Sequence, residues 1–283
     1  MEKKIIFFDV DGTLVPDEPG FEKVLESTKE AITKTRAKGN LVYLCTGRSK
    51  AEIYPYIMAV GIDGVIGAGG GYVEIGDTML YHKKVTNDAV KHMVDYFEKH
   101  NFDYYLESNG GLFASKNLVS RLEFILYGDY INDPKAKERK EKGGNHFIDA
   151  MIEHQDMYRE DINKACFLEN KDIPFEEIRK EFEGQFNVIH CTVPAFGDDS
   201  GELSVPNIHK ANAIEALINH LGIDQKNTYA FGDGLNDVEM LQYCHVGIAM
   251  GNAKQGLKDI ADEITDDASS DGIYNAMKKH NLI

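Results

Sequence analysis

The sequence predicts an α/β protein whose main domain is a doubly wound parallel sheet, with a smaller α/β domain inserted into it. Short apolar runs that suit buried strands alternate with segments of helical periodicity. Several of these runs end directly in polar turns, where parallel sheets present their ligand-binding groups. The character changes in the middle of the chain, so we expect a core domain of residues 1–83 and 191–283 and an inserted domain of residues 84–190.

The composition limits the partners and the compartment of the protein. The chain has 283 residues, and 47 Asp and Glu against 31 Lys and Arg give a net charge of −16. Such a charge argues against a nucleic-acid or anionic-membrane partner, whereas a small anionic substrate can still bind in a local pocket. No run reaches the roughly 18 to 20 apolar residues of a membrane span and no signal peptide is visible, so we expect a cytoplasmic protein. The cysteines suit buried positions in a reducing compartment; they are Cys45, Cys166, Cys191 and Cys244.

The first predicted strand ends in two carboxylates. Residues 5–8 form an apolar run, and the sequence DVDGT follows at residues 9–13. Packing poorly explains two aspartates at a strand end beside a tight turn. Such a pair suits a hard-cation ligand set, a nucleophile or a general acid/base pair.

After this turn, predicted strands and helices alternate, which indicates βαβ units and a parallel sheet. The same alternation resumes after the insertion. The glycine run of residues 67–71 does not match a dinucleotide or P-loop fingerprint. Polar turns follow the strands at Thr46-Gly47-Arg48 and at residues 232–237, and Lys210 lies at the start of a helix. In the core we expect a loop over 15–20, helices over 21–38, 49–60, 210–220, 238–243, 273–280 and from 252, strands over 41–45, 64–66, 202–206, 228–231, 246–249 and 263–265, and a hairpin over 72–81.

The inserted segment predicts a separate α/β unit. Its charge run of residues 135–142 is typical of a solvated helix face. Side chains that could line a substrate pocket or merely pack are Tyr104, Tyr105, Asn109, His146 and His190. We expect helices over 85–100, 118–144 and 174–182, and strands over 103–107, 111–115, 165–168 and 186–193.

Four motifs together resemble the haloacid dehalogenase (HAD) superfamily of phosphohydrolases. Residues 9–13 match its DxDGT motif, Thr46 its Ser/Thr motif, Lys210 its single lysine and residues 232–237 its GDxxND motif. Two departures are small: Ala211 follows the lysine where relatives usually have Gly, and Gly69 replaces an Asn of relatives with large caps. The resemblance implies a Rossmann-like core.

The resemblance also implies phosphoryl transfer through an aspartyl-phosphate. Asp9 would be the nucleophile, and Asp11 would protonate the leaving oxygen and later deprotonate water. Thr46, the N–H of Gly47 and Lys210 would bind the transferring phosphoryl group.

The implied cofactor is Mg²⁺, held by the Asp9 carboxylate, the Asp11 backbone carbonyl and Asp233. Arg48 would contact phosphate or form a surface salt bridge. The residues expected to support the site are Thr13, Arg48, Asn236 and Asp237.

The subclass follows from Asp11 and from the place of the insertion. A transporting ATPase of this superfamily has Thr at position 11, and a dehalogenase lacks this second aspartate. An α/β insertion between the second and third motifs resembles the C2 cap of the Cof-type (IIB) subfamily, which would close over the core and select the leaving group. We therefore expect a Mg²⁺-dependent phosphatase acting on phosphate monoesters of small metabolites, either sugar phosphates or cofactor and nucleotide phosphates. The alternatives are a phosphomutase or phosphotransferase on a sugar phosphate, and a non-catalytic binding protein of the same fold.

Overall fold

The computed structural model describes residues 2–17, 23–191 and 193–283, which form two compact units. The core unit comprises the described residues up to Arg48, then Ile53–His82 and Ile208–Ile283. The inserted unit comprises Ser49–Glu52 and the described part of Lys83–Asn207. None of the helices in the described ranges has both the length and the apolar character needed to cross a bilayer.

In the described part of the chain, the core unit is built on an eight-stranded sheet in the order β14-β13-β12-β1-β2-β3-β4-β5. The strands from β14 to β3 are parallel, and β4 and β5 continue the sheet in antiparallel fashion. The predicted α/β fold with a parallel sheet is thus confirmed. The strands are β1 (Ile5–Phe8), β2 (Leu41–Cys45), β3 (Gly64–Gly67), β4 (Tyr72–Ile75), β5 (Thr78–His82), β12 (Thr228–Gly232), β13 (Val246–Ala249) and β14 (Glu263–Ile264).

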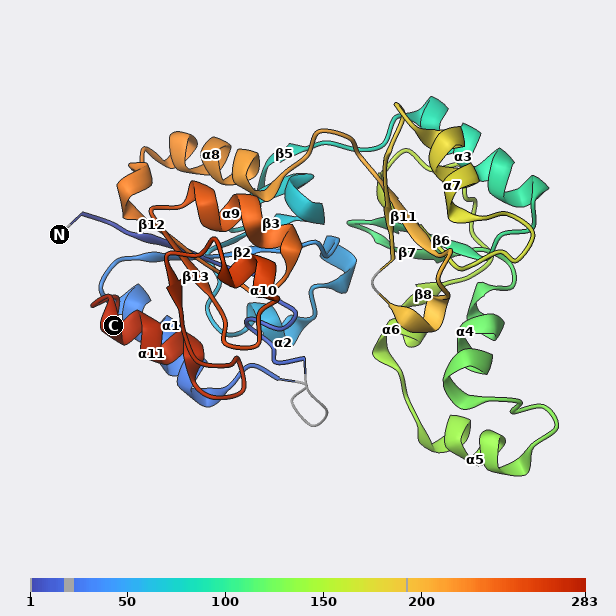
Figure 1. Cartoon of the computed structure of the whole chain (residues 1–283), viewed down its shortest axis with the longest axis horizontal. Coiled ribbons are helices and arrows are strands. Elements are labelled where there is room, and N and C mark those ends of the chain that lie inside the picture. Colours follow the sequence, from blue (N-terminus) through green and yellow to red (C-terminus); the bar gives the residue numbers. More distant parts are fainter. Residues whose placement is uncertain (1, 18–22, 192) are drawn as a thin grey trace. The chain divides into compact units, whose positions relative to one another are not determined.

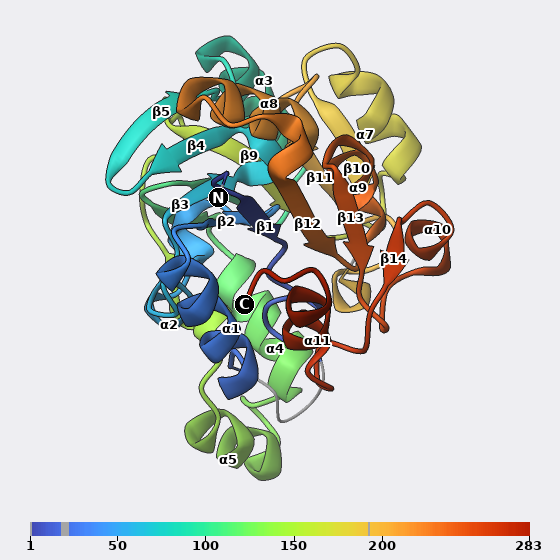
Figure 2. The same cartoon turned by 90° about the vertical axis from the view of Figure 1, so that its left-hand side faces the viewer.

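Helices cover both faces of this sheet, which explains the uninterrupted apolar run of β1. Ile5 and Phe7 pack into one cluster with α8 and α9, while Ile6 and Phe8 pack on the opposite face with α1 and α11. Figure 1 shows these two helix layers on either side of the sheet, and Figure 2 shows α1 and α11 side by side. The helical segments are α1 (Glu26–Ala37), α2 (Pro55–Met58), η2 (Ala68–Gly70), α8 (Lys210–Leu221), η4 (Gln225–Asn227), η5 (Leu235–Asp237), α9 (Val238–Tyr243), α10 (Gln255–Lys258) and α11 (Gly272–Lys279).

The inserted unit has its own sheet, in the order β10-β11-β9-β6-β7-β8. Its main core lies between one face of this sheet and helices α3 and α7, where buried side chains include Phe97, Phe167 and Ile178. A smaller cluster with α4 lies under Tyr105. The elements are η1 (Lys50–Glu52), α3 (Asn87–Lys99), β6 (Tyr104–Ser108), β7 (Gly111–Ala114), α4 (Leu118–Tyr127), α5 (Pro134–Lys142), α6 (His146–Asp149), β8 (Met151–Ile152), β9 (Ile162–Phe167), α7 (Phe175–Phe182), β10 (Asn187–His190), η3 (Pro194–Phe196) and β11 (Gly201–Ser204).

The strand predicted over residues 202–206 does not join the core sheet. It is β11, which pairs antiparallel with β9 and β10 in the inserted unit. Leu203 is fully buried in the core of that unit. The inserted unit therefore continues to Asn207, whereas the sequence placed the boundary at residue 190.

Several predicted helices are shorter or broken. The segment 49–60 consists of η1 and α2, because Pro55 occupies the first turn of a new helix. The segment 118–144 splits into α4 and α5, whose start is marked by Pro134 and by the Asp133 side chain that caps it. The helix predicted from residue 252 is the short α10. Helix α1 begins at Glu26; residues 21–22 of its predicted range, and 18–20 of the predicted loop, lie outside the described residues.

Candidate active site

The polar turns predicted from the sequence lie at one edge of the core sheet. Strands β12, β1 and β2 are adjacent and parallel, so their carboxyl ends meet at that edge. Asp9 follows β1, Thr46 follows β2 and Asp233 follows β12. Lys210 opens α8, the helix that packs on one face of these strands.

Lys210 connects two aspartates in the interior of this site. Its Nζ lies 2.6 Å from Oδ1 of Asp9 and 2.6 Å from Oδ1 of Asp237. The three side chains are almost entirely buried, with exposed fractions of 3%, 9% and 0% for Lys210, Asp9 and Asp237. A buried ammonium needs such partners, because an isolated charge in the interior is strongly unfavourable.

The same burial shifts the protonation equilibria. Burial disfavours the charged form of Lys210, but attraction by Asp237 and Asp9 outweighs it and holds the pKa of Lys210 above its usual value. Burial raises the pKa of Asp9, and the ammonium of Lys210 opposes that rise. Lys210 thus keeps its positive charge at neutral pH and favours the carboxylate form of Asp9.

Asp237 also holds the turn that presents Asp233. Its Oδ2 accepts hydrogen bonds of 3.1 Å from the backbone N–H groups of Asp233 and Gly234. Both of its oxygens are therefore engaged within the protein. Asn236, expected to support this site, is exposed in the same turn. The GDxxND turn thus presents Asp233 while Asp237 stays buried behind it.

The turn after β1 is fitted closely to Asp233. The Thr13 hydroxyl donates a hydrogen bond of 3.0 Å to Oδ1 of Asp233. Gly12 has φ +73°, and a Cβ added there would overlap the Asp233 carboxylate. The Asn252 side chain donates a 2.7 Å hydrogen bond to the Gly12 carbonyl and accepts one from the Ala268 N–H. Asn252 was missed in the sequence, since a lone Asn beside a strand carries no distinctive signal.

Arg48 forms a two-pronged ion pair with Asp11. Its Nε and Nη2 lie 2.9 Å and 2.6 Å from the two carboxylate oxygens. Of the two roles considered for Arg48, the structure shows a salt bridge, and its partner is the second aspartate of the DxDGT motif. The Arg48 N–H also donates to the Thr46 hydroxyl at 3.1 Å. Gly47 lies half-buried between these two residues.

The donor set suits a hard divalent cation. Carboxylate oxygens of Asp9, Asp233 and Asp237 lie within 4.8 Å of one another. All are oxygen ligands, which Mg²⁺ prefers. Because both oxygens of Asp237 are engaged by Lys210 and the turn, Asp9 and Asp233 are the carboxylates that would contact a metal. Burial raises the pKa of Asp233 to about 6, and the Thr13 hydrogen bond opposes the rise.

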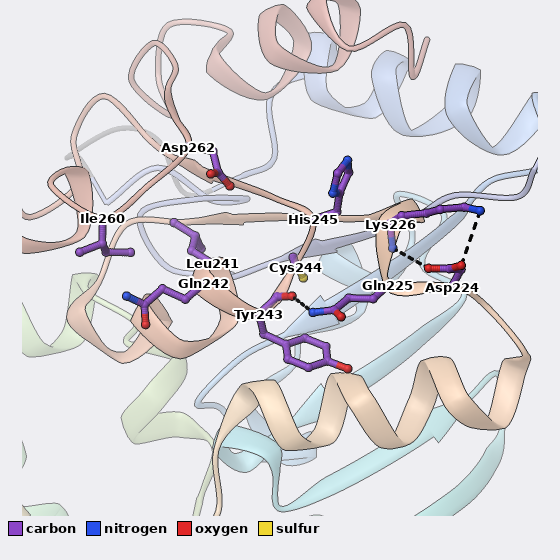
Figure 3. Close-up of a pocket in the computed structure, with 10 residues that line it drawn as sticks. All are labelled: Asp224, Gln225, Lys226, Leu241, Gln242, Tyr243, Cys244, His245, Ile260 and Asp262. Carbon is purple, nitrogen blue, oxygen red and sulfur yellow. Dashed lines mark hydrogen bonds and ion pairs between the residues drawn. The ribbon is translucent and has the colours of Figure 1, made fainter.

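A large surface hollow of the core unit lies at the opposite edge of the sheet (Figure 3). Its volume is about 620 Å³, and it is lined by residues that precede β12 and β13. Four of its residues are bonded in pairs: Gln225 donates to the Tyr243 carbonyl, and Lys226 pairs with Asp224. Ligands of parallel sheets bind at the carboxyl ends of strands, so this hollow is not the candidate site.

Four of the side chains of the inserted unit that could line a substrate pocket make contacts within the protein. Tyr104 and Tyr105 are buried in the clusters described above and serve packing. The His190 ring stacks on Phe175 with ring centroids 3.6 Å apart. Asn109 accepts a hydrogen bond of 2.9 Å from Asn163.

Comparisons with known proteins agree with this geometry. Residues 6–277 match the family described as haloacid dehalogenase-like hydrolase. The protein YkrA of Bacillus subtilis (strain 168) is 28% identical over 287 residues, covering 100% of both chains. The 5-amino-6-(5-phospho-D-ribitylamino)uracil phosphatase YcsE of the same organism is 26% identical and covers 97% of this chain and 94% of its own. The structure of a HAD subclass IIB sugar phosphatase superposes with a TM-score of 0.73, at 25% identity and over 99% of this chain and 100% of that chain.

Proposed function

Because this chain belongs to the haloacid dehalogenase-like hydrolases and is a phosphatase, we propose that it hydrolyses phosphate monoesters of small metabolites with Mg²⁺ as its cofactor. The observation that carries the proposal is the buried Asp9–Lys210 pair at the carboxyl end of β1. A carboxylate held beside an ammonium can approach an anionic phosphoryl group with less repulsion.

The first half-reaction forms an aspartyl-phosphate. A carboxylate oxygen of Asp9 attacks phosphorus while the bond from phosphorus to the alcohol oxygen breaks. Asp11 gives a proton to that leaving oxygen, so a neutral alcohol departs. Thr46, the Gly47 N–H and Lys210 would bind the phosphoryl oxygens during the transfer.

The second half-reaction releases phosphate. Asp11, now a carboxylate, takes a proton from water as the water oxygen attacks phosphorus. The phosphorus–Asp9 bond breaks, which restores both carboxyl groups to their starting states. Asp9 and Asp233 would hold Mg²⁺, which supplies charge neutralisation to the phosphoryl group when it is bound.

The substrate class is a small phosphorylated metabolite. The names of two relatives support this breadth: one acts on a phosphorylated ribitylamino-uracil and the other is a sugar phosphatase. Both substrates carry a phosphate ester, which is the part that the Asp9 site would recognise.

The test is phosphate release from a panel of phosphorylated sugars, nucleotides and cofactors, with and without Mg²⁺. We expect metal-dependent release that Asp9→Asn abolishes. Asp77→Asn is the matched control, because Asp77 is exposed in the turn between β4 and β5. Formation of an isomerised sugar phosphate in place of free phosphate would indicate a phosphomutase and not a phosphatase. Phosphate release that is unaffected by Asp9→Asn would refute the mechanism.

A further inference from the structure

The loop after β13, residues 250–254, contacts both of the turns that carry the candidate metal ligands. The Lys254 N–H donates a hydrogen bond of 2.9 Å to the Asp233 carbonyl, in the turn after β12. The Asn252 side chain donates one of 2.7 Å to the Gly12 carbonyl, in the turn after β1. All of these residues belong to the core unit, so the contacts lie within one compact body. The loop therefore connects two turns that are distant in the sequence.

Both ends of the Asn252 side-chain amide are engaged. Its Oδ1 accepts a hydrogen bond of 2.9 Å from the Ala268 N–H, and its Nδ2 donates to the Gly12 carbonyl. Because a backbone N–H can only donate, the contact with Ala268 identifies the oxygen end of the amide and directs the NH₂ group to Gly12. The Asn252 side chain is exposed to solvent, so these two bonds are what select its rotamer.

The backbone that carries Asn252 is attached to the segment that supplies the Ala268 N–H. The Gly251 N–H donates a hydrogen bond of 3.0 Å to the Asp266 carbonyl. A Cβ added at Gly251 would overlap Asp267, so the two segments lie in close contact. Asn252 therefore extends from a backbone that is itself fixed.

Gly12 is held at both of its backbone polar groups. Its N–H donates a hydrogen bond of 2.9 Å to the Val15 carbonyl, and its carbonyl accepts the one from Asn252. Gly12 has φ +73°, and a glycine can leave such a conformation easily unless neighbouring groups hold it. The Asp11 carbonyl belongs to the same planar trans peptide as the Gly12 N–H and points the opposite way. The two bonds to Gly12 thus fix the direction of the Asp11 carbonyl.

We propose that Asn252 is a positioning residue for Mg²⁺ binding: by holding the Gly12 carbonyl, it fixes the direction of the Asp11 carbonyl. That carbonyl is the ligand expected together with the carboxylates of Asp9 and Asp233. The inference rests on the proposed function, because Mg²⁺ at this site is part of it. Removing a residue that orients a metal ligand through a hydrogen bond typically weakens metal affinity by about 10- to 100-fold. Asn252 acts here without contacting the metal itself.

The test is the Mg²⁺ affinity of metal-free native protein and of Asn252→Ala, measured by isothermal titration calorimetry at about pH 8, where Asp233 is ionised. We expect the Kd of Asn252→Ala to rise about tenfold, the lower end of the range because the side chain is exposed. Asn227→Ala is the matched control: it removes a hydrogen bond of 3.2 Å to Glu2, at the opposite edge of the sheet. An unchanged Kd in Asn252→Ala, or an equal rise in both variants, would overturn the proposal.

The Mg²⁺ dependence of phosphate release separates positioning from a merely structural role. Asn252→Ala should need about tenfold more Mg²⁺ for half-maximal release and should reach the native kcat within about twofold at saturating Mg²⁺. Its urea midpoint in the absence of metal should match that of Asn227→Ala, since each variant loses hydrogen bonds of one partly exposed side chain. A raised KM for the phosphate ester at saturating Mg²⁺, with an unchanged Kd for Mg²⁺, would assign Asn252 to the substrate and overturn the proposal.

Failure of the proposed function has a different signature. In that case the native protein itself binds no Mg²⁺ and releases no phosphate, whereas failure of this inference leaves the native protein active and Asn252→Ala equal to it. Hydrogen exchange of the metal-free protein tests the contact alone. Faster exchange at the Gly12 amide in Asn252→Ala, but not in Asn227→Ala, supports the contact, and unchanged exchange overturns it.

Discussion

Oδ1 of Asp237 lies 2.6 Å from Nζ of Lys210, and no more than 3% of either side chain is exposed. The same ammonium contacts Asp9, so one buried cation serves two buried anions. Asp237 thereby holds Lys210 in place, while its second oxygen closes the turn after β12. A side chain that would not itself touch the substrate thus fixes both the cation and a candidate metal ligand.

Replacing Asp237 by Ala should destabilise the core unit by about 3 kcal/mol. Lys210 would lose one of its two charge partners, and the amides of Asp233 and Gly234 would lose their acceptor. Urea denaturation followed by circular dichroism measures the change. Asp77→Ala, at an exposed turn, should leave the free energy of unfolding within about 0.5 kcal/mol of the native value. Equal effects of the two substitutions would contradict this assignment.

Substituting Gly12 by Ala should abolish phosphate release, because its Cβ would displace the Asp233 carboxylate. Gly222→Ala is the matched control: Gly222 has a similar φ of +66°, but no atom lies within 4 Å of an added Cβ. Both variants should lose about 1 kcal/mol of stability from backbone strain, while the loss of activity is confined to Gly12→Ala. Activity retained in Gly12→Ala would show that the fit between the two turns is not needed.

Mg²⁺ binding should weaken in acid. The pKa of Asp233 is raised by burial to about 6, above that of an unfolded aspartate, so its carboxylate is fully formed only at higher pH. Protons then compete with the metal at Asp233, and the affinity should fall about tenfold per pH unit below about pH 6. Calorimetric Mg²⁺ titrations between about pH 5 and pH 8 measure this. Asp233→Asn should remove most of the binding, and a pH-independent affinity in the native protein would contradict the assignment of Asp233 as ligand.

Leu203→Ala should destabilise the inserted unit by about 3 kcal/mol. Leu203 is fully buried among the side chains of that unit, although the sequence placed its strand in the core sheet. Hydrogen exchange should therefore accelerate in β6 and β9 but not in β1 and β12. Accelerated exchange in β1 and β12 instead would show that Leu203 stabilises the core unit and would contradict its assignment to the inserted unit.

The fold and much of the site could be predicted because they depend on local signals. Alternate residues of β1 pack into cores on opposite faces of the sheet, so every residue of the strand is apolar. The DxDGT and GDxxND turns directly follow two such buried strands. The carboxyl ends of parallel neighbours then share an edge, so Asp9 and Asp233 were expected close together, as the structure shows.

The pairing of β11 could not be predicted, since a short apolar strand does not indicate which of two sheets it joins. The Asp11–Arg48 ion pair was only one of two alternatives, because a lone arginine after a strand suits phosphate as well as a carboxylate. The roles of Asp9, Asp11, Thr46 and Lys210 in catalysis stay predictions that the proposed experiments address.

The division of the chain between the two units affects how this protein could be recombined with its relatives. A chimera that exchanged residues 84–190 alone would separate β11 from its native neighbours β9 and β10 and would remove Glu107 and Asn163 from Ser49. A strand that pairs poorly with its new neighbours exposes backbone groups that promote aggregation. A graft of the whole inserted unit would therefore have to take residues 83–207 and adapt residues 49–52 as well.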